Sequence, residues 1–576
     1  MLRRTALLIT LTLLGGTAAA EGLRLNLQGI DDEALRENVQ AYLAPIEKEG
    51  AADTFSDRAR IDKAVRLGLR ALGYYEPIVS ILKDDNRRDT LRVQVMPGTP
   101  IRLAGVDVTI SGEGKDERPF TRRLKKLPKA GTVLNHGDYE NFKAELSAAA
   151  MRRGYFDAGF TRSELGVSLP RHEAYWTIDY DTGQRWRFGK VTYRGSQIDT
   201  RLLDNMKPFK EGDYYTSDDL AEFNRRLSNM GWFSSVVLAP DFDAAREDPE
   251  RHLPMEAEVA PKKRNSFEVG VGVASDVGPH ARLVWQKPWV NRRGHSLTSS
   301  TAVSADEQAL DFTYKIPRLA NPYEEYWLFQ GGLKHENLND TRSNSTVLAV
   351  SRNWEFADGW QRSVGVHMSY DSFTQGSVDT SALLIYPGVS FSRTRAKGGM
   401  MPWWGDSQRF SLDVSSEWIG SDIDFLILQA QQTWVRTWRW KHRFVARGNA
   451  GWIKTNSFDK VPPDLRFFAG GDRSVRGYDY KSISPRDGSG QLTGASTLLT
   501  GSLEYQYNVT GKWWAAVFFD IGEAADGFAN ADWKKGAGAG IRWNSPVGPV
   551  KLDLAVPVGD PEKSGLQFYI GLGSEL

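Results

Sequence analysis

The sequence predicts α+β repeats followed by an all-β half, a C-terminal transmembrane antiparallel β-barrel of about sixteen strands. Two sequence marks recur three times in matched order before residue 265. After that residue, apolar and polar side chains alternate with a period of two, as they do in strands that separate lipid from water. After the N-terminal 20 residues, the chain has no stretch of about 20 apolar residues, which is the length that a membrane helix needs. We therefore expect a barrel rather than membrane helices.

The composition limits the function classes. The mean hydropathy of -0.45 argues against a bundle of membrane helices but permits a barrel, because half of each barrel strand faces a polar lumen. The net charge of +1 provides no bulk attraction to nucleic acid, and no nucleic-acid partner is predicted. The chain has no Cys, which excludes disulfides and Cys-ligated zinc.

The first 20 residues predict a secretory signal peptide. Arg3 and Arg4 form a positive region, Thr5 to Leu14 are largely apolar, and Ala18-Ala19-Ala20 provides a cleavage signal before Glu21. The alternative, an uncleaved anchor, is disfavoured because the apolar stretch is too short to span a bilayer. We therefore expect residues 1–20 to be removed and the mature chain to be exported.

Two marks define three repeats. The first is a β-like segment that ends in Gly, and its glycines, Gly29, Gly112 and Gly195, are evenly spaced. The second is a Gly followed by two aromatic residues: Gly73-Tyr74-Tyr75, Gly154-Tyr155-Phe156 and Gly231-Trp232-Phe233. Coincidence is the alternative, and the matched order of two independent marks argues against it.

A helix is predicted before each second mark, over 62–72, 139–153 and 218–230, because apolar residues recur there at spacings of three and four. The Gly then fits a helix C-cap, and the aromatic pair packs the helix end against a following strand. Each unit therefore reads β-α-α-β-β, with predicted boundaries of 21–103, 104–188 and 189–264.

The second half, 265–576, predicts the barrel. Alternation is clear in Phe267 to Ala274, Phe410 to Trp418 and Val550 to Val556. A soluble β-sandwich or propeller could also alternate. Large aromatic residues near the expected strand ends favour a membrane barrel with interfacial belts; they are Trp285, Trp289, Tyr326, Trp327, Trp403, Trp404, Trp434, Trp438 and Trp440.

A long segment between two predicted strands, Thr455 to Gln491, contains the most informative motif, Val475-Arg476-Gly477-Tyr478. A loop of this length is usually functional or disordered, and its glycine-rich, aromatic and charged content favours order. Arg476 is predicted to enter a constrained site and to seek a carboxylate with bidentate geometry. The alternative is a solvated loop charge.

This motif resembles the VRG(F/Y) motif of the outer-membrane assembly-factor family that includes BamA, TamA and the two-partner secretion translocators. The three repeats resemble the polypeptide-transport-associated (POTRA) domains of that family, and residues 538–549 also resemble its pattern. The resemblance implies that the loop folds back into the barrel and that Arg476 pairs with Glu504 and Asp520 on the inner wall.

Three repeats resemble the TamA branch of the family. The resemblance implies a barrel in the outer-membrane lipid, POTRA domains in the periplasm, and a TamB-like partner anchored in the inner membrane. It implies unfolded outer-membrane or autotransporter clients that are inserted or exported. The alternatives are a two-partner secretion translocator, a general BamA-type insertase and a passive pore.

A lateral seam is the predicted site of client entry. Closing the barrel requires the strand at Phe267–Ala274 to meet the strand at Leu566–Gly573, and both contain glycines, which weaken strands. The alternative is that these glycines only relieve crowding inside the barrel. The seam residues are Val269, Gly270, Val271, Gly272, Phe568, Ile570, Gly571 and Gly573.

No enzyme is predicted. The eight His residues are scattered, and the sequence contains neither H-E-x-x-H nor G-x-S-x-G. We therefore expect no catalytic residues, no bound metal and no cofactor.

Overall fold

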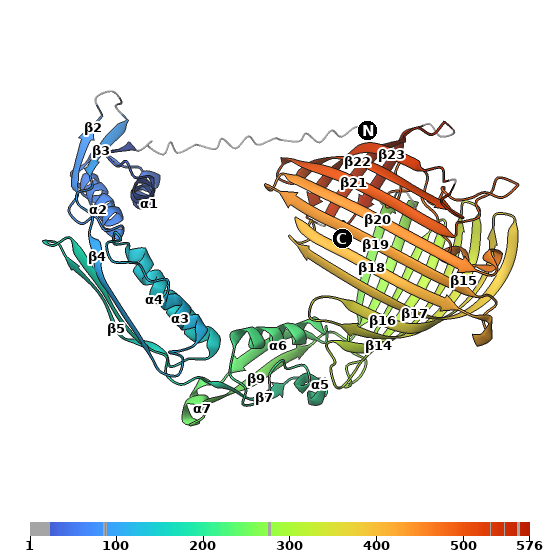
Figure 1. Cartoon of the computed structure of the whole chain (residues 1–576), viewed down its shortest axis with the longest axis horizontal. Helices are drawn as coiled ribbons and strands as arrows, with labels where there is room; N and C mark the ends of the chain where they lie inside the picture. The colour runs from blue at the N-terminus through green and yellow to red at the C-terminus, as the bar shows by residue number, and fades with distance from the viewer. Residues whose placement is uncertain are drawn as a thin grey trace, which may run out of the picture. The chain divides into compact units, whose positions relative to one another are not determined.

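The structure is a computed structural model that describes residues 23–84, 87, 89–274, 278–529, 531–546, 548–561 and 565–576. The predicted signal peptide, residues 1–20, lies outside the described residues. Three three-stranded sheets precede one sixteen-stranded sheet (Figure 1), which confirms the predicted fold class. None of the helices described is both long enough and apolar enough to cross a membrane.

The first repeat has the strand order β1-β3-β2, in which β1 (Arg24–Gln28) is parallel and β2 (Ile78–Lys83) antiparallel to β3 (Thr90–Met96). Helices α1 (Glu33–Glu49) and α2 (Phe55–Ala71) begin after Asp32 and Thr54, whose side chains accept hydrogen bonds from backbone N–H groups of the first turn. The apolar side of α2 predicted by spacing is buried, because Val65 and Leu69 are fully covered.

The second repeat has the order β4-β6-β5, formed by β4 (Arg102–Ser111), β5 (Gly159–Ser168) and β6 (Glu173–Asp181). Helices α3 (Arg118–Leu124) and α4 (His136–Arg153) follow β4 in the chain. Gly154 ends α4 in the left-handed conformation at φ 81°, as expected for a Gly C-cap.

The third repeat has the order β7-β9-β8, formed by β7 (Arg187–Arg194), β8 (Phe233–Pro240) and β9 (His252–Pro261), with helices α5 (Thr200–Asp204) and α6 (Ser217–Asn229). It departs from the predicted β-α-α-β-β pattern, since a third helix, α7 (Phe242–Glu247), lies between its last two strands. The side chain of Asp241 caps α7 by accepting a hydrogen bond from the Ala244 N–H at 3.0 Å.

The barrel is a meander in which every strand is antiparallel to the next one in the chain (Figure 1). Its strands are β10 (Ser266–Ala274), β11 (Gly278–Lys287), β12 (Ser296–Ser304), β13 (Glu307–Pro317), β14 (Glu325–Leu338), β15 (Thr341–Glu355), β16 (Gln361–Gln375), β17 (Val378–Lys397), β18 (Trp404–Ser415), β19 (Phe425–Trp438), β20 (His442–Thr455), β21 (Thr497–Thr510), β22 (Trp513–Ala525), β23 (Lys534–Ser545), β24 (Gly548–Pro557) and β25 (Gln567–Leu572).

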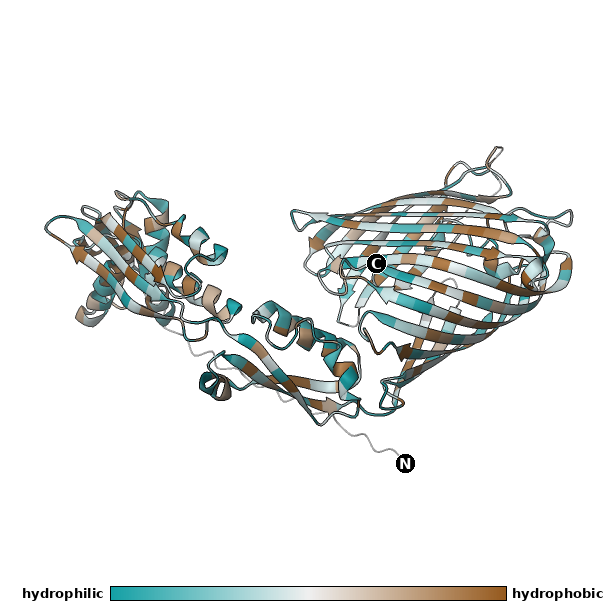
Figure 2. Ribbon diagram, turned by 60° about the horizontal axis from the view of Figure 1, so that its bottom comes forward, coloured by the Kyte–Doolittle hydropathy of each residue, from teal (hydrophilic) through white to brown (hydrophobic). Residues whose placement is uncertain are grey.

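Alternation assigns the two faces of the barrel wall. On β15, Ser343, Ser345 and Ser351 are buried, whereas Leu348 and Val350 are exposed. Apolar and polar residues accordingly alternate along the strands in Figure 2. The outer face is thus apolar and the inner face polar, which is the arrangement of a barrel surrounded by lipid.

Strand β18 ends earlier than its alternation predicts. Trp418 was expected to extend the strand, but it lies in the 3-10 turn Glu417–Ile419 and is 91% exposed. The Ser416 hydroxyl accepts a hydrogen bond from the Trp418 N–H at 3.3 Å, and Gly420 has φ 96°, so local turn chemistry ends the strand.

Candidate functional site inside the barrel

The loop between β20 and β21, residues 456–496, packs inside the barrel and is ordered by its own buried residues. Val475, Arg476 and Tyr478 are at most 2% exposed, and Val475 and Tyr478 belong to an apolar cluster that includes inner-wall residues such as Leu384 of β17. Bridges Phe467 to Ala495 and Ala469 to Ile483 fold the loop on itself. A segment with this much buried surface is a packed element rather than a mobile connection.

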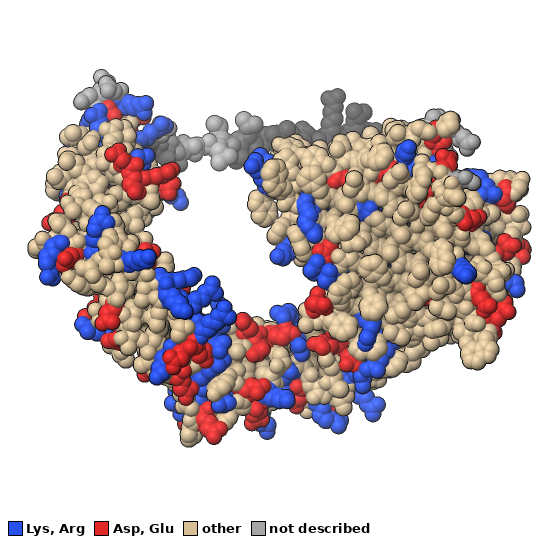
Figure 3. Space-filling view, in the orientation of Figure 1, with Lys and Arg blue, Asp and Glu red and all other residues tan. Residues whose placement is uncertain are grey.

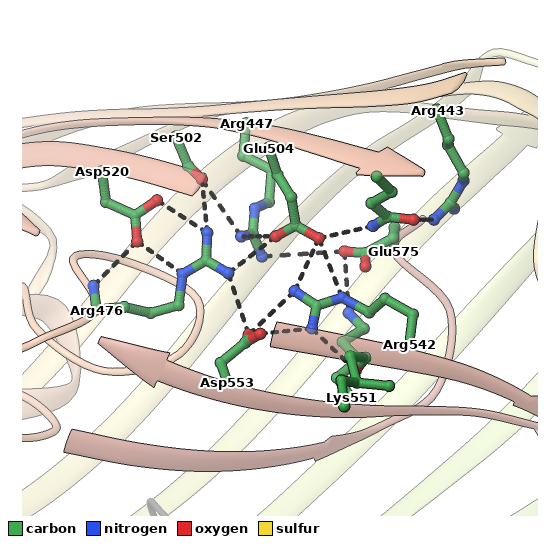
Figure 4. Close-up of polar contacts among 12 residues, drawn as sticks. Arg443, Arg447, Arg476, Ser502, Glu504, Asp520, Arg542, Lys551, Asp553 and Glu575 are labelled. Carbon is green, nitrogen blue, oxygen red and sulfur yellow. Dashed lines mark hydrogen bonds and ion pairs between the residues drawn. The ribbon is translucent and has the colours of Figure 1, made fainter. Parts of the chain in front are cut away.

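Arg476 lies at the centre of the site (Figure 4). Its Nε and Nη2 donate to the two carboxylate oxygens of Asp520 at 2.7 and 3.0 Å. Its Nη1 donates to Glu504 at 2.9 Å and to Asp553 at 3.1 Å. The three carboxylates come from β22, β21 and β24, so one guanidinium from the loop joins three strands of the inner wall.

A second guanidinium joins the network of carboxylates. Arg542 of β23 is 1% exposed and donates to Glu504 at 2.7 Å and to Asp553 at 3.0 Å. Gln506 donates to Glu504 at 2.6 Å. Buried carboxylates are stable only when they are paired and hydrogen-bonded, and this network provides both conditions.

The loop backbone lies close to the barrel wall at two glycines, where a side chain would not fit. A Cβ added to Gly536 of β23 would overlap the Arg476 carbonyl oxygen, and one added to Gly477 would overlap the backbone of Val556 on β24. The Gly477 N–H also donates to the Tyr569 hydroxyl of β25 at 2.9 Å, and that hydroxyl donates to the Tyr478 carbonyl at 2.8 Å. The motif Val475–Tyr478 therefore packs against β23, β24 and β25.

The opposite side of the loop contacts earlier strands. Lys481 forms an ion pair with Glu336 of β14 at 2.7 Å, and Gln375 of β16 donates to the Leu492 carbonyl at 2.7 Å. Lys334 of β14 pairs with Asp464 at 2.8 Å. The loop thus spans the lumen and connects the two sides of the barrel wall.

The segment after β25 also enters the lumen. The Glu575 side chain is 4% exposed and pairs with Lys551 of β24 at 2.9 Å and with Arg447 of β20 at 4.0 Å (Figure 4). A cavity of about 540 Å³ is lined by these residues together with Arg476 and Arg542. The end of β25 is therefore held by charge to the inner wall.

The two end strands of the sheet, β10 and β25, approach each other without forming a ladder among the described residues. Val269 and Val271 of β10 are 74% and 83% exposed. An outward residue of a strand that is paired on both sides is less exposed, as Leu348 of β15 shows at 52%. A Cβ on Gly270 would have no neighbour within 4 Å, so crowding does not explain this glycine. The predicted seam residues Phe568, Ile570, Gly571 and Gly573, together with Gly272, lie on or next to these two strands.

The structure brings Arg476, Glu504 and Asp520 together, as the motif implied. Asp553, Arg542 and Glu575 also belong to this site, although the sequence did not predict them. The signal for Asp553 was present, because it alternates with Leu552 and Leu554 and so faces the lumen. No group of three or more potential ligands that could hold a metal ion occurs within the described ranges.

Comparisons with known proteins agree with this geometry. Residues 265–576 match the family model described as the Omp85 superfamily domain. Residues 24–97 match a model described as POTRA domain TamA domain 1, and residues 186–260 match a POTRA model described as surface antigen variable number repeat.

The outer membrane protein assembly factor BamA of Nitratidesulfovibrio vulgaris is 22% identical over 533 residues, covering 87% of this chain and 66% of the relative. BamA of Neorickettsia risticii is 22% identical over 517 residues, covering 84% and 67%. The chain thus spans about two thirds of the length of these curated relatives.

The crystal structure of BamA from Haemophilus ducreyi lacking POTRA domains 1-3 aligns with a TM-score of 0.68 at 14% identity, covering 82% of this chain and 99% of that chain. This likeness concerns the fold. The barrel, its inward loop and the family model together identify the chain as a member of the Omp85 superfamily that carries POTRA domains.

Proposed function

We propose that this protein is an assembly factor that inserts or translocates other proteins at the outer membrane. Its barrel lies in that membrane and its POTRA domains lie in the periplasm. Client strands first meet the exposed sheet edges of the POTRA domains, which can accept an added strand. They then reach the seam between β10 and β25.

The proposal rests on the two end strands of the barrel, β10 and β25, which form no ladder with each other among the described residues. Within the described residues, β25 is a six-residue strand paired only with β24, and β10 is paired only with β11. Unpaired strand edges present rows of N–H and C=O groups that another strand can bind. A passive pore has no need of such an edge, and the loop that spans the lumen obstructs free diffusion.

We further infer a TamA-type role with autotransporters among the clients. The three repeats and the match of the first one to a TamA POTRA model support this branch. A TamB-like protein anchored in the inner membrane is the proposed partner. The role proposed is non-catalytic, and the free energy comes from client folding or from that partner.

A disulfide across the seam tests the mechanism. The chain has no Cys, so cysteines placed at or beside Val269 and Ile570 form the one possible bridge. We expect the oxidised protein to lose client assembly and to recover it after reduction. The matched control joins Leu283 and Thr301, which face each other on β11 and β12, and should leave assembly unchanged. Full assembly by the oxidised seam variant would rule out lateral entry.

Affinity isolation of the protein from gently solubilised membranes tests whether it has the proposed TamA-type role. Recovery of a TamB-like protein is expected. Recovery of lipoproteins instead would indicate a general BamA-type insertase, and recovery of one large exoprotein would indicate a two-partner secretion translocator.

A further inference from the structure

The outer wall of β17, β18 and β19 carries a cluster of cations and tryptophans at one end of the barrel. Strands alternate in direction from β10, so the turn before β18 lies at the end where the chain enters the barrel from the third repeat. Two lateral rows cross the wall there: Lys397-Trp404-Arg436 and Arg395-Asp406-Trp434. We call these six residues the rim cluster.

The rim cluster faces outward, toward the lipid. Phe391 and Phe410 are paired neighbours on the same strands, 42% and 41% exposed, and they lie at even spacing from the cluster residues. Side chains at even spacing in a strand share a face. The outer wall thus passes from apolar side chains to cations toward this end of the barrel, where Figure 3 shows blue side chains along its edge.

One tryptophan of the cluster, Trp404, lies beside all three of its cations. The Arg436 guanidinium lies 4.7 Å from the Trp404 ring centre, and Arg395 and the Lys397 Nζ lie 5.5 and 5.4 Å from it. Three cations on one indole are attracted by its electron-rich faces, but they also repel one another. This arrangement concentrates positive charge beside an amphipathic ring.

One carboxylate balances only part of this charge. Asp406 is 1% exposed and receives Arg395 at 2.9 Å and Arg436 at 3.6 Å. Both guanidiniums remain partly exposed, with side-chain exposures of 43% and 46%. Among the described residues Lys397 has no ion-pair partner. The cluster therefore retains two uncompensated positive charges on the lipid-facing surface.

The adjacent turn also carries a cation and a tryptophan, and both have a backbone conformation that is unusual for large side chains. Arg439 and Trp440 have φ values of 49° and 58°, the left-handed conformation that hairpin turns normally assign to Asn or Gly. A bulky residue there is strained. Arg439 nevertheless stacks on Trp438 at 4.4 Å, and Trp440 is 71% exposed and contacts Trp403. The fold by itself does not require these two side chains.

We propose that the rim cluster, with Arg439 and Trp440, binds the phosphate of anionic phospholipid head groups in the periplasmic leaflet of the membrane. Guanidinium forks match phosphate oxygens, and tryptophan rings sit at head-group depth. The continuity with apolar, lipid-facing side chains places the ligand at the membrane surface, which favours a lipid over an acidic protein. Juxtamembrane cations attract anionic lipid in this way.

The test uses the full-length protein in nanodiscs of phosphatidylcholine with increasing phosphatidylglycerol, and native mass spectrometry counts the lipids that remain bound. The double variant Lys397→Gln/Arg436→Gln should lower the preference for phosphatidylglycerol about tenfold or more. The matched control, Arg342→Gln/Lys454→Gln, removes the same charge at the other end of the barrel and should keep the preference. An unchanged preference in the rim variant, or an equal loss in the control, overturns the proposal.

A second variant distinguishes a loss of lipid binding from a loss of barrel stability. Arg439→Asn/Trp440→Gly relieves the turn strain, so it should raise the thermal midpoint of the barrel while it reduces retention of phosphatidylglycerol. Retention at the original level contradicts the proposal. Displacement of the bound lipid by millimolar inorganic phosphate also contradicts it, because it would indicate an ion site rather than a lipid head-group site.

Discussion

Arg476 and Asp520 form a two-pronged ion pair inside the barrel, with N–O distances of 2.7 and 3.0 Å and side-chain exposures of 1% and 0%. The Arg476 backbone N–H donates to the same carboxylate at 3.1 Å. The loop is thereby fixed to β22 through both its main chain and its side chain.

Replacing Arg476 with alanine should destabilise the barrel. The change leaves Asp520 without an ion-pair partner among the described residues. Glu504 and Asp553 keep the guanidinium of Arg542. Breaking a buried ion pair typically costs about 3–5 kcal/mol. We expect the lower end of that range, because the adjacent cavity of about 540 Å³ admits water. Thermal unfolding followed by loss of the folded band on electrophoresis measures the effect.

Arg473→Ala is the matched control, since Arg473 lies in the same loop, is exposed, and has no ion pair among the described residues. It should unfold like the unmodified protein. Equal midpoints for the two variants would show that the Arg476 pairing does not stabilise the barrel.

Replacing Tyr569 with phenylalanine should loosen β25. The hydroxyl accepts from the Gly477 N–H and donates to the Tyr478 carbonyl, and its loss leaves a buried N–H unsatisfied at a cost of about 1–3 kcal/mol. Hydrogen exchange in residues 567–572 and 475–478 should become faster together. Tyr370→Phe, at an exposed position of β16, should leave both segments unchanged. Faster exchange in only one segment would contradict the coupling.

Replacing Gly294 with alanine should disturb the contact between the third repeat and the barrel. Trp232 donates from its indole nitrogen to the Gly294 carbonyl at 3.0 Å, and a Cβ at Gly294 would overlap the indole ring. Such overpacking typically costs about 1–3 kcal/mol. Limited proteolysis near residue 264 should become faster.

Gly212→Ala controls for backbone strain in that experiment. Gly212 has a similar positive φ of 89°, compared with 70° at Gly294, but open space around its Cβ position. If the two variants are cleaved equally fast, strain rather than the indole contact is responsible.

The junction of the first two repeats should weaken in acid. His136 lies 2.7 Å from the Tyr75 hydroxyl, and burial together with the nearby Arg70 lowers the pKa of His136 below its ordinary value, although Glu140 opposes this. The folded state therefore favours the neutral ring. Its stabilising contribution is complete above the unfolded pKa of about 6.5 and decreases as the pH falls below it.

Nuclear magnetic resonance of ring-labelled histidine can follow this titration, and His136→Gln assigns the signal among the eight histidines. The midpoint should lie below about 6.5, the ordinary value. A midpoint above that value would contradict the role of burial at this junction.

The local features of the fold could be predicted because their signals are local. Spacings of three and four residues predicted the buried side of α2 at Val65 and Leu69, and the period of two predicted the outward face of β10 at Val269 and Val271. Helix α7 was not predicted, because its six residues are too few to show the helical spacing of apolar side chains. Its cap at Asp241 was the available signal.

The sequence by itself determined three α+β repeats, a barrel of about sixteen strands and a loop whose arginine pairs with carboxylates. Local periodicity and the Val475–Tyr478 motif carry that information. Only the tertiary structure decided that Asp553 and Arg542 share the network, that Glu575 turns into the lumen, and that β10 and β25 form no ladder among the described residues. Those contacts join residues far apart in the chain. They depend on how the wall curves and where its strands end, which no local pattern of side chains specifies.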